Sequence, residues 1–366
     1  MSENSRKASP LRRAEAKHRR AARTFQGIPG IAVSGGGRLF ACWYSGGTAE
    51  CAANFVGVAV SDDRGETWSD FEWVVDPAPP EVRAFDPTLW LAPDGSMLLF
   101  WAQCVSRRDW DVFDGENGVW FSRLADPDAA VEDFAWSAPV RIADGVMMNK
   151  PCVLSDGAWA LPVSVWGVYP GRGDPANYGA KIVVSTDGGR TFSERGKVAV
   201  PAPDVNFDEH SIAELPDGRL FMLIRCPSGY RESFSADRGA TWSPAVRSAW
   251  RGPCSRAFFG RLASGKYLMV GNDSRARTDL TAWLVDGSLV RTSALRLDTR
   301  SDVSYPDMAQ APDGTIYIVH DRDRRSGGFI YLDRLHEEDL LAGRRVHSDS
   351  CLGIEISHTR PVPAAD

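Results

Sequence analysis

One short pattern recurs six times along this chain of 366 residues: a tight turn that ends in glycine and is followed at once by an apolar run, as in 215-LPDGRLFMLI. Asp-Gly and Ser-Gly turns need positive φ, and flanks rich in Leu, Phe, Trp, Ile and Val favour a pleated surface, so each copy predicts a β-hairpin. Successive copies are roughly 50 to 60 residues apart, which leaves room for about four strands each. The turn glycines are Gly37, Gly95, Gly157, Gly218, Gly265 and Gly314. The sequence therefore predicts an all-β fold, a six-bladed β-propeller.

A second repeat follows the pattern SxDxGxT and then Trp or Phe, in 61-SDDRGETW, 185-STDGGRTF and 235-SADRGATW. The Asp carboxylate of such a turn can accept backbone N–H bonds, and the final aromatic ring can fold back into the blade core. We interpret the motif as a device of the fold rather than as a catalytic element. Helical periodicity is limited to 336-HEEDLLAG, which disfavours an α/β fold.

Composition and charge exclude several classes of function. The net charge is -6 with both signs spread along most of the chain, so no nucleic-acid partner is expected. Eight Lys or Arg occur in the first 23 residues, which predicts a basic tail over 1–23 and a propeller over 24–360. Neither a signal peptide nor a membrane span is expected. Seven scattered cysteines predict free thiols in the cytoplasm, and we expect neither a metal nor a cofactor.

Polar residues share a register with the turn glycines. Because the innermost strand of every blade points one end at the central axis, equivalent positions from different blades can meet in one funnel. Nine residues before four of the glycines stand Asp86, Glu209, Arg256 and Tyr305, and Lys150 lies at a neighbouring offset. Seven residues after the glycines stand Tyr44, Ala102, Ser164, Arg225, Asn272 and Asp321. Carboxylates, arginines and a tyrosine in one funnel predict a site that binds an anionic or polyhydroxylated sugar and cleaves its glycosidic bond.

The three SxDxGxT motifs on a six-bladed pattern resemble the Asp-box, or BNR, repeats of the sialidase superfamily, over residues of about 24 to 335. The resemblance implies that Tyr305, in 303-VSYPDM, is a nucleophile activated by Glu209, because a phenol with a pKa near 10 is a poor nucleophile unaided. It also implies that Arg225 and Arg277, the latter in 275-RARTDLTAWL, hold a substrate carboxylate.

The chain departs from the family pattern at two places. Sialidases carry an aspartate as acid/base on the loop after the first hairpin, and the matching residue here is Glu50. Sialidases also begin 26-QGIPGI with an arginine before Ile-Pro, the first of three that bind the carboxylate, and this chain has Gly27 instead. Asp321 corresponds to the acidic residue that braces that arginine, and it lacks this partner unless Arg23, Arg83 or Lys150 reaches it. Asp86 is expected to orient substrate hydroxyls, and Arg256 and Lys150 are further binding candidates.

Three functions are open from these residues. The leading hypothesis is a retaining, sialidase-like exo-glycosidase that hydrolyses a terminal acidic sugar, with Tyr305, Glu209 and Glu50 as catalytic residues. The second is a polysaccharide lyase acting on uronic acids, in which His210 or Tyr305 removes a proton. His210 would point away from the funnel if Glu209 faces it, since adjacent strand residues alternate. The third is a non-catalytic propeller that binds carbohydrate.

Overall fold

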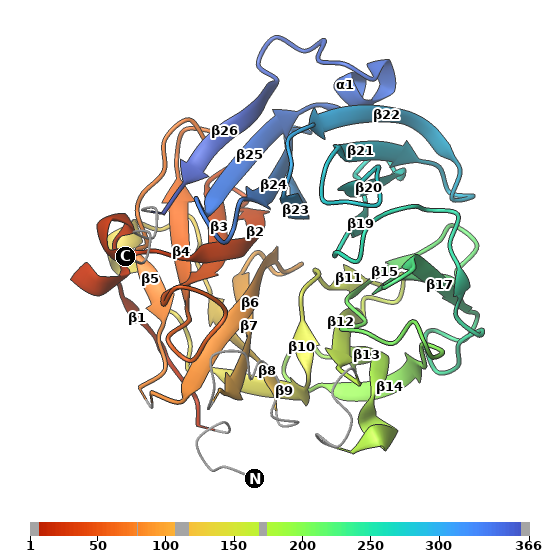
Figure 1. Ribbon diagram of the computed structural model, residues 1–366, viewed down its shortest axis with the longest axis horizontal. Helices are drawn as coiled ribbons and strands as arrows, with labels where there is room; N and C mark the ends of the chain where they lie inside the picture. Colours follow the sequence, from red (N-terminus) through yellow and green to blue (C-terminus); the bar gives the residue numbers. More distant parts are fainter. Residues whose placement is uncertain (1–6, 79, 107–116, 168–173, 360–366) are drawn as a thin grey trace, which may run out of the picture.

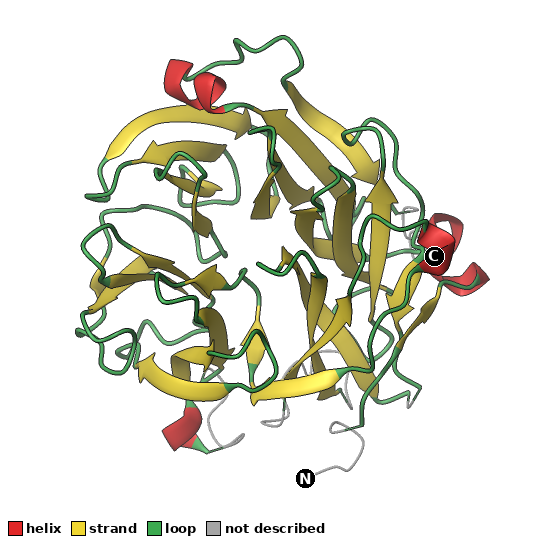
Figure 2. Cartoon of the chain, turned by 180° about the vertical axis from the view of Figure 1, so that it is seen from behind, coloured by secondary structure: helices red, strands yellow, loops and turns green. Residues whose placement is uncertain are grey.

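A computed structural model describes residues 7–78, 80–106, 117–167 and 174–359. Six antiparallel sheets are arranged in a ring around a central axis (Figure 1), which confirms the predicted six-bladed propeller. Apart from β1, which is the outermost strand of its sheet, the strands of each sheet run in chain order from the axis outward, and the short helical segments lie at the outer rim (Figure 2). No helix in the described ranges is long and apolar enough to cross a membrane.

The first three blades contain the N-terminal half of the chain. Blade 1 has the strands β1 (Leu11–Arg13), β2 (Gln26–Val33), β3 (Leu39–Ser45), β4 (Phe55–Ser61) and β5 (Trp73–Val75). Blade 2 has β6 (Val82–Leu91), β7 (Met97–Val105), β8 (Gly118–Leu124) and β9 (Val140–Asp144). Blade 3 has β10 (Val146–Met147), β11 (Cys152–Val153), β12 (Trp159–Val165), β13 (Gly179–Ser185) and β14 (Ser193–Val198).

The other three blades follow the same order. Blade 4 has β15 (His210–Glu214), β16 (Leu220–Cys226), β17 (Gly229–Ser235) and β18 (Val246–Arg247). Blade 5 has β19 (Phe258–Arg261), β20 (Tyr267–Asn272), β21 (Leu280–Val285) and β22 (Arg291–Asp298). Blade 6 has β23 (Val303–Gln310), β24 (Ile316–Arg322), β25 (Phe329–Leu335) and β26 (Cys351–Ser357). The helical segments are α1 (Glu337–Ala342), η1 (Ala16–His18), η2 (Arg20–Ala22), η3 (Val131–Asp133) and η4 (Pro175–Asn177).

The six turn glycines lie in the hairpins β2–β3, β6–β7, β11–β12, β15–β16, β19–β20 and β23–β24 near the axis, with φ between +82° and +94°. A Cβ added at Gly95 or Gly218 would meet no atom within 4 Å, so backbone conformation rather than space selects glycine there. All six turns lie at the same end of their blades, because equivalent strands run in the same direction. The polar residues nine positions before and seven positions after these glycines therefore lie at the opposite end of the axis.

The three SxDxGxT motifs connect β4 to β5 in blade 1, β13 to β14 in blade 3 and β17 to β18 in blade 4, at the same end as the hairpin turns. In the blade 4 copy, Asp237 accepts hydrogen bonds from Ser235 Oγ and from the backbone and hydroxyl of Thr241, at 2.6 to 2.8 Å. Trp242 donates from Nε1 to the Gly239 carbonyl at 3.1 Å and packs against the blade core. The motifs thus lie at the end of the propeller opposite the polar registers and act in folding, as their sequence indicates.

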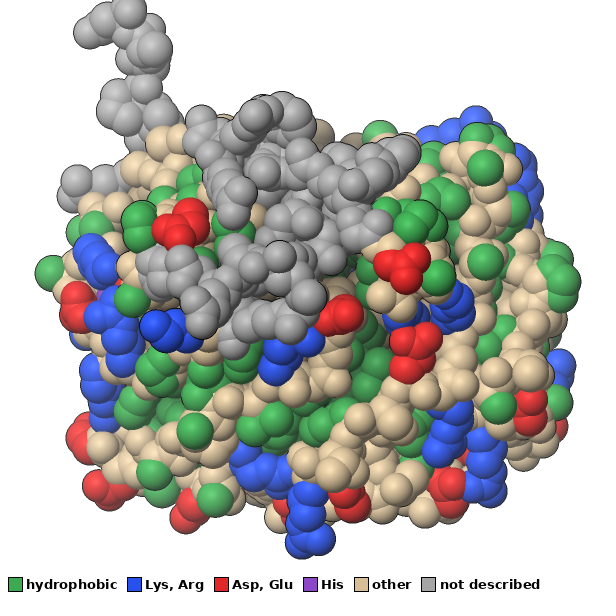
Figure 3. Space-filling view, turned by 90° about the horizontal axis from the view of Figure 1, so that it is seen from below, with side chains coloured by type: hydrophobic (Ala, Val, Ile, Leu, Met, Phe, Trp, Pro, Cys, Tyr) green, Lys and Arg blue, Asp and Glu red, His purple; other side chains and the backbone are tan. Residues whose placement is uncertain are grey.

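Part of the basic segment that we expected to be a tail belongs to blade 1. Strand β1 pairs antiparallel with β5 and adds a fifth strand to the outside of this blade. Arg23 is 2% exposed, donates to Asp70 Oδ1 and Ser357 Oγ at 3.0 Å, and stacks over Phe71. Arg12 and Lys17 form ion pairs with Asp76 and Arg23 forms one with Asp70, both carboxylates of blade 1, and Ser357 of β26 connects Arg23 to blade 6. Acidic and basic side chains alternate on the face seen in Figure 3, without a single-sign stripe among the residues drawn in colour.

Candidate active site

A cavity of about 460 Å³ opens at the end of the axis to which the polar registers point. Six of the predicted site residues line it: Glu50, Asp86, Glu209, Arg225, Arg277 and Tyr305. One wall is apolar, formed by Phe85, Met148, Trp166 and Phe207. The remaining lining residues are Ile28, Tyr44, Arg83, Asp302, Arg324 and Arg325. Charged groups facing an aromatic wall can hold the charged substituents and the apolar face of one sugar ring.

Two of these side chains are aimed into the cavity by the same backbone device. Asp86 in β6 and Tyr305 in β23 have φ of +47° and +53°, and each is followed by proline. Ile28 in β2 has φ +55° and also precedes a proline. The strand pairing shifts register at all three points, so each inner strand carries a β-bulge. Bulges re-aim side chains and positive φ is costly for residues with a Cβ, which is typical of functional positions.

Tyr305 and Glu209 are linked through Arg225. The Nη1 atom of Arg225 donates to Glu209 Oε1 at 2.5 Å and to the Tyr305 hydroxyl oxygen at 3.0 Å. All three side chains are at least nine-tenths buried, and Glu209 Oε2 has no hydrogen-bond partner in the described part of the chain. The free carboxylate oxygen is available to accept a proton. Burial raises the pKa of the Tyr305 phenol above its ordinary value, even though Arg225 lowers it, so ionisation of Tyr305 requires a base.

Glu50 lies at the rim of the cavity, on the loop between β3 and β4. Asn54 shapes this loop by donating to the carbonyls of Gly46 and Ala49, at 2.7 and 2.9 Å. The Glu50 side chain is 44% exposed, and its Oε1 accepts from the Tyr44 hydroxyl at 3.0 Å. Burial acts to raise the pKa of Glu50, but Arg324 and Arg83 outweigh it and hold the pKa below its ordinary value. The position allows proton exchange with a group that leaves toward solvent.

Asp86 faces Glu50 and Glu209 across the cavity. Burial, opposed by Arg83 and reinforced by these two carboxylates, raises the pKa of Asp86 to about 7. A carboxyl group with that pKa is partly protonated at neutral pH and can both donate to and accept from substrate hydroxyls.

Four predicted site residues do not line this cavity. Arg256 is 1% exposed and donates to the carbonyls of Met148, Tyr305 and Pro306, so it fixes the backbone around the bulge. Lys150 forms a buried ion pair with Asp307 and lines a separate cavity of about 380 Å³ further along the axis. The structure assigns both to the support of the inner strands, because their charges are already satisfied within the protein.

The other two are His210 and Asp321. His210 is 2% exposed, and its ring nitrogens lie 2.8 and 3.1 Å from the carbonyls of Lys181 and Asp208. Burial lowers the pKa of His210 to about 4, and neither nitrogen faces the cavity, as the alternation of strand residues indicates. Asp321 is 1% exposed and binds a lining residue that the sequence interpretation missed, Arg324.

Arg324 lies just after β24 and lines the cavity. None of Arg23, Arg83 or Lys150, the partners considered for Asp321 from sequence, takes that role: Arg324 Nε donates to Asp321 Oδ2 at 2.9 Å. The available signal was the run 322-RDRR-325, which follows Asp321 directly and falls outside the axial register.

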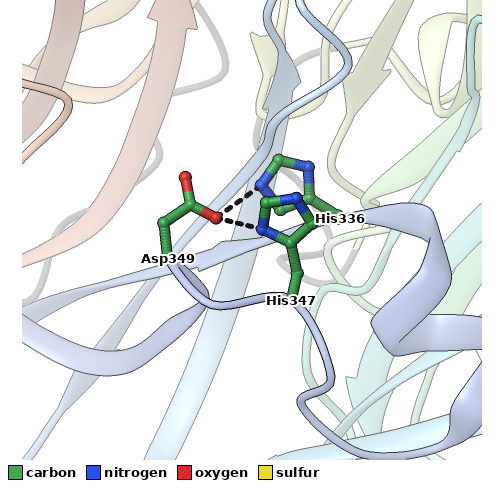
Figure 4. Close-up of side chains that lie close together, drawn as sticks. All are labelled: His336, His347 and Asp349. Atoms are coloured by element: carbon green, nitrogen blue, oxygen red, sulfur yellow. Dashed lines mark hydrogen bonds and ion pairs between the residues drawn. The ribbon is translucent and has the colours of Figure 1, made fainter.

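Among the described residues, one group of potential metal ligands lies elsewhere, at the outer edge of blade 6: His336 is the N-cap of α1, and His347 and Asp349 lie on the loop that follows this helix. His336 Nε2 and His347 Nδ1 lie 2.8 and 2.5 Å from the same oxygen of Asp349 (Figure 4). The second oxygen of Asp349 forms an ion pair with Arg64 at 2.7 Å. The three groups satisfy one another and tie this loop to blade 1, and they are separate from the cavity.

The fold and the cavity together define a class, the sialidase-like propellers with Asp-box turns. Residues 37–318 match the family of BNR repeat-like domains, and the chain belongs to that family. A sialidase of Paraclostridium sordellii is 28% identical over 214 residues, which are 51% of this chain and 49% of the relative, so the chain spans about half the length of that curated relative.

Solved structures resemble the fold. A Hadza microbial sialidase, Hz136, superposes with a TM-score of 0.67 at 18% identity, covering 83% of this chain and 64% of the other. A leech intramolecular trans-sialidase, complexed with 2,7-anhydro-Neu5Ac, has a TM-score of 0.67 at 14% identity, covering 92% and 71%. At these identities the likeness extends to the fold alone.

Proposed function

We propose that this protein is a retaining exo-glycosidase that hydrolyses a terminal acidic sugar, either a sialic acid or a related acidic saccharide. The observation that carries the proposal is the arrangement of Tyr305, Arg225 and Glu209, in which one guanidinium group contacts both the phenol and the carboxylate. A neutral tyrosine that reacts with the anomeric carbon avoids the repulsion that a carboxylate nucleophile meets beside a substrate carboxylate. Tyrosine nucleophiles are an established variant of glycoside hydrolysis.

The proposed reaction has two steps. The Tyr305 oxygen bonds to the anomeric carbon as Glu209 takes the phenolic proton, and Glu50 donates a proton to the leaving glycosidic oxygen. Glu50, now ionised, then removes a proton from water, whose oxygen displaces Tyr305 while Glu209 returns the proton to the phenol. Two inversions give net retention at the anomeric carbon. Arg225 and Arg277 hold the anionic group, and Asp86 binds hydroxyls.

The experiment that tests this function uses the purified protein on a fluorogenic sialoside and on a panel of uronic-acid and neutral aryl glycosides. We expect release of the fluorophore from an acidic glycoside, and NMR should show the retained anomer as the first product. A polysaccharide lyase would instead leave an unsaturated sugar that absorbs in the ultraviolet. Sugar binding without any turnover would identify a non-catalytic propeller.

Glu50 gives a prediction with a specific signature. Substitution Glu50→Gln should lower kcat by about 10² to 10⁴-fold for substrates with alkyl leaving groups, which need a proton. With aryl glycosides whose leaving group has a low pKa, the first step in Glu50→Gln should be almost as fast as in the native protein. This would be seen as a pre-steady-state burst of the released aryl group. Equal losses for both leaving groups would contradict the acid/base role.

The pH profile checks the same residue. Glu50 must be protonated in the first step, so activity should fall as pH rises through its pKa in the substrate complex, and this alkaline limb should disappear in Glu50→Gln. The groups that face Glu50 and set this pKa are Tyr44, Arg83, Asp86, Arg324 and Arg325. In the free protein the neighbouring arginines lower the pKa of Glu50, so the limb for kcat/KM should lie at a more acidic pH than in their absence.

A further inference from the structure

Gly27 stands at the position from which sialidases extend an arginine, and the space in front of it is filled. A Cβ added to Gly27 would lie 2.4 Å from Arg324 Cδ and 2.5 Å from its Cγ and Nε. Gly27 is not among the glycines with positive φ, so its backbone conformation does not require glycine. A side chain at position 27 would therefore require Arg324 to move from its observed position, because real Cβ contacts are not shorter than about 3 Å.

Hydrogen bonds centred on Asp321 hold Arg324 in place. Its side chain is 11% exposed, and Asp321 Oδ2, which accepts from Arg324 Nε at 2.9 Å, also accepts from the backbone N–H of Ile28 at 2.9 Å. The other oxygen of Asp321 accepts from Ser304 Oγ at 2.9 Å. Asp321 is therefore fixed on both oxygens and orients the guanidinium group toward the cavity.

The remaining nitrogens of Arg324 leave donors for a ligand. Nη1 lies 3.3 Å from Glu50 Oε1, and Nη2 is buried without a hydrogen-bond partner among the described residues. The guanidinium carbon lies 4.5 Å from the centre of the Tyr305 ring, and that of Arg277 lies 5.1 Å from it. Arg225 contacts the hydroxyl of the same tyrosine. Three guanidinium groups that line the cavity thus surround the proposed nucleophile from blades 4, 5 and 6, and Arg256, outside the cavity lining, lies 5.5 Å from the centre of the same ring.

We propose that Arg324 is the third arginine of the carboxylate site, supplied from the segment after β24 in place of the residue at position 27. The two positions form a coupled pair: a small residue at 27 makes room for Arg324, and Arg324 supplies the charge that position 27 lacks. This inference rests on the proposed function for its substrate class, a terminal sugar that carries a carboxylate.

The test measures binding of N-acetylneuraminic acid, glucuronic acid and their methyl esters by calorimetry or ligand-observed NMR. Substitution Arg324→Gln should weaken binding of the preferred acid by about 10- to 100-fold, the loss of one charge-assisted bidentate contact, and should barely change binding of the ester. Arg322→Gln, in the same segment but paired with Asp323 and outside the cavity lining, is the matched control and should bind as the native protein does.

The coupling is tested by exchange. Gly27→Arg alone should lower the melting temperature and weaken acid binding, because the new side chain meets Arg324. Gly27→Arg combined with Arg324→Gly should recover both the melting temperature and acid binding. A double variant no better than the Gly27→Arg variant would overturn the coupling, and loss of folding in one variant leaves the Arg324→Gln result to decide.

The outcomes separate this inference from the proposed function. Sialoside cleavage with unchanged acid binding in Arg324→Gln would overturn the inference and leave the glycosidase in place. Acid binding that depends on Arg324, without turnover of any glycoside, would support the inference and overturn the glycosidase. A native protein that binds neither acid better than its ester would overturn the carboxylate site.

Discussion

Substitution Tyr305→Phe should reduce kcat on an acidic glycoside by about 10³-fold or more, because the only atom removed is the one that bonds to the anomeric carbon. The ring that packs beside Arg277 and Arg324 remains, so the cavity and substrate binding should be preserved. The measurement is a single-turnover assay on the preferred substrate of the native protein, with ligand binding and thermal unfolding as companions.

The matched control for this variant is Tyr230→Phe. Tyr230 is also buried, its hydroxyl has no hydrogen-bond partner in the described part of the chain, and it does not line the cavity. It should retain native activity. If Tyr305→Phe keeps native kcat while binding is intact, the phenol oxygen is not the nucleophile and the proposed mechanism is wrong.

Substitution Glu209→Gln should have two large effects. The base that accepts the phenolic proton is lost, so kcat/KM should fall by about 10² to 10⁴-fold. Arg225 also loses its countercharge in an ion pair whose side chains are 6% and 3% exposed, and removing one partner of a buried pair costs on the order of 3 to 5 kcal/mol of unfolding free energy. Urea denaturation measures the stability and steady-state kinetics the activity.

Glu214→Gln is the matched control, at the other end of β15. Glu214 accepts from the backbone and hydroxyl of Ser155, remote from the Tyr305 hydroxyl, and its loss should leave kcat unchanged. A Glu209→Gln variant with native stability and native activity would show that this carboxylate neither balances Arg225 nor moves the proton.

The sequence predicts the fold from features that act locally. Glycine is needed at the turns because of φ, and the spacing of these turns leaves room for one blade each, so the propeller follows from short-range rules. The axial register follows as well, because the inner strand of every blade has the same direction. Tyr305, Glu209, Asp86 and Arg225 lie around one cavity for that reason.

The same register also selects residues that serve the scaffold. Arg256 and Lys150 occupy axial offsets, yet their charges are satisfied by backbone carbonyls and by Asp307. The spacing from the turn glycine predicts the strand end at which a residue lies. It does not predict whether the side chain pairs with a group of the protein or faces the cavity. The basic N-terminal segment is a similar case. No acidic partner of Arg23 can be identified from the sequence, but in the fold Arg23 donates to Asp70.

The sequence by itself determined the six blades, the turn at each hairpin and the convergence of a tyrosine, carboxylates and arginines on one axis, because periodicity and backbone conformation are local properties. Only the tertiary structure decided that Arg324 fills the space before Gly27, because that contact joins a segment of blade 6 to the first strand of blade 1. The ring closes between these two blades, so residues from opposite ends of the chain meet there. The space in front of Gly27 and the charge of Asp321 determine that Arg324 faces the cavity. The spacing of residues along the chain does not predict this contact.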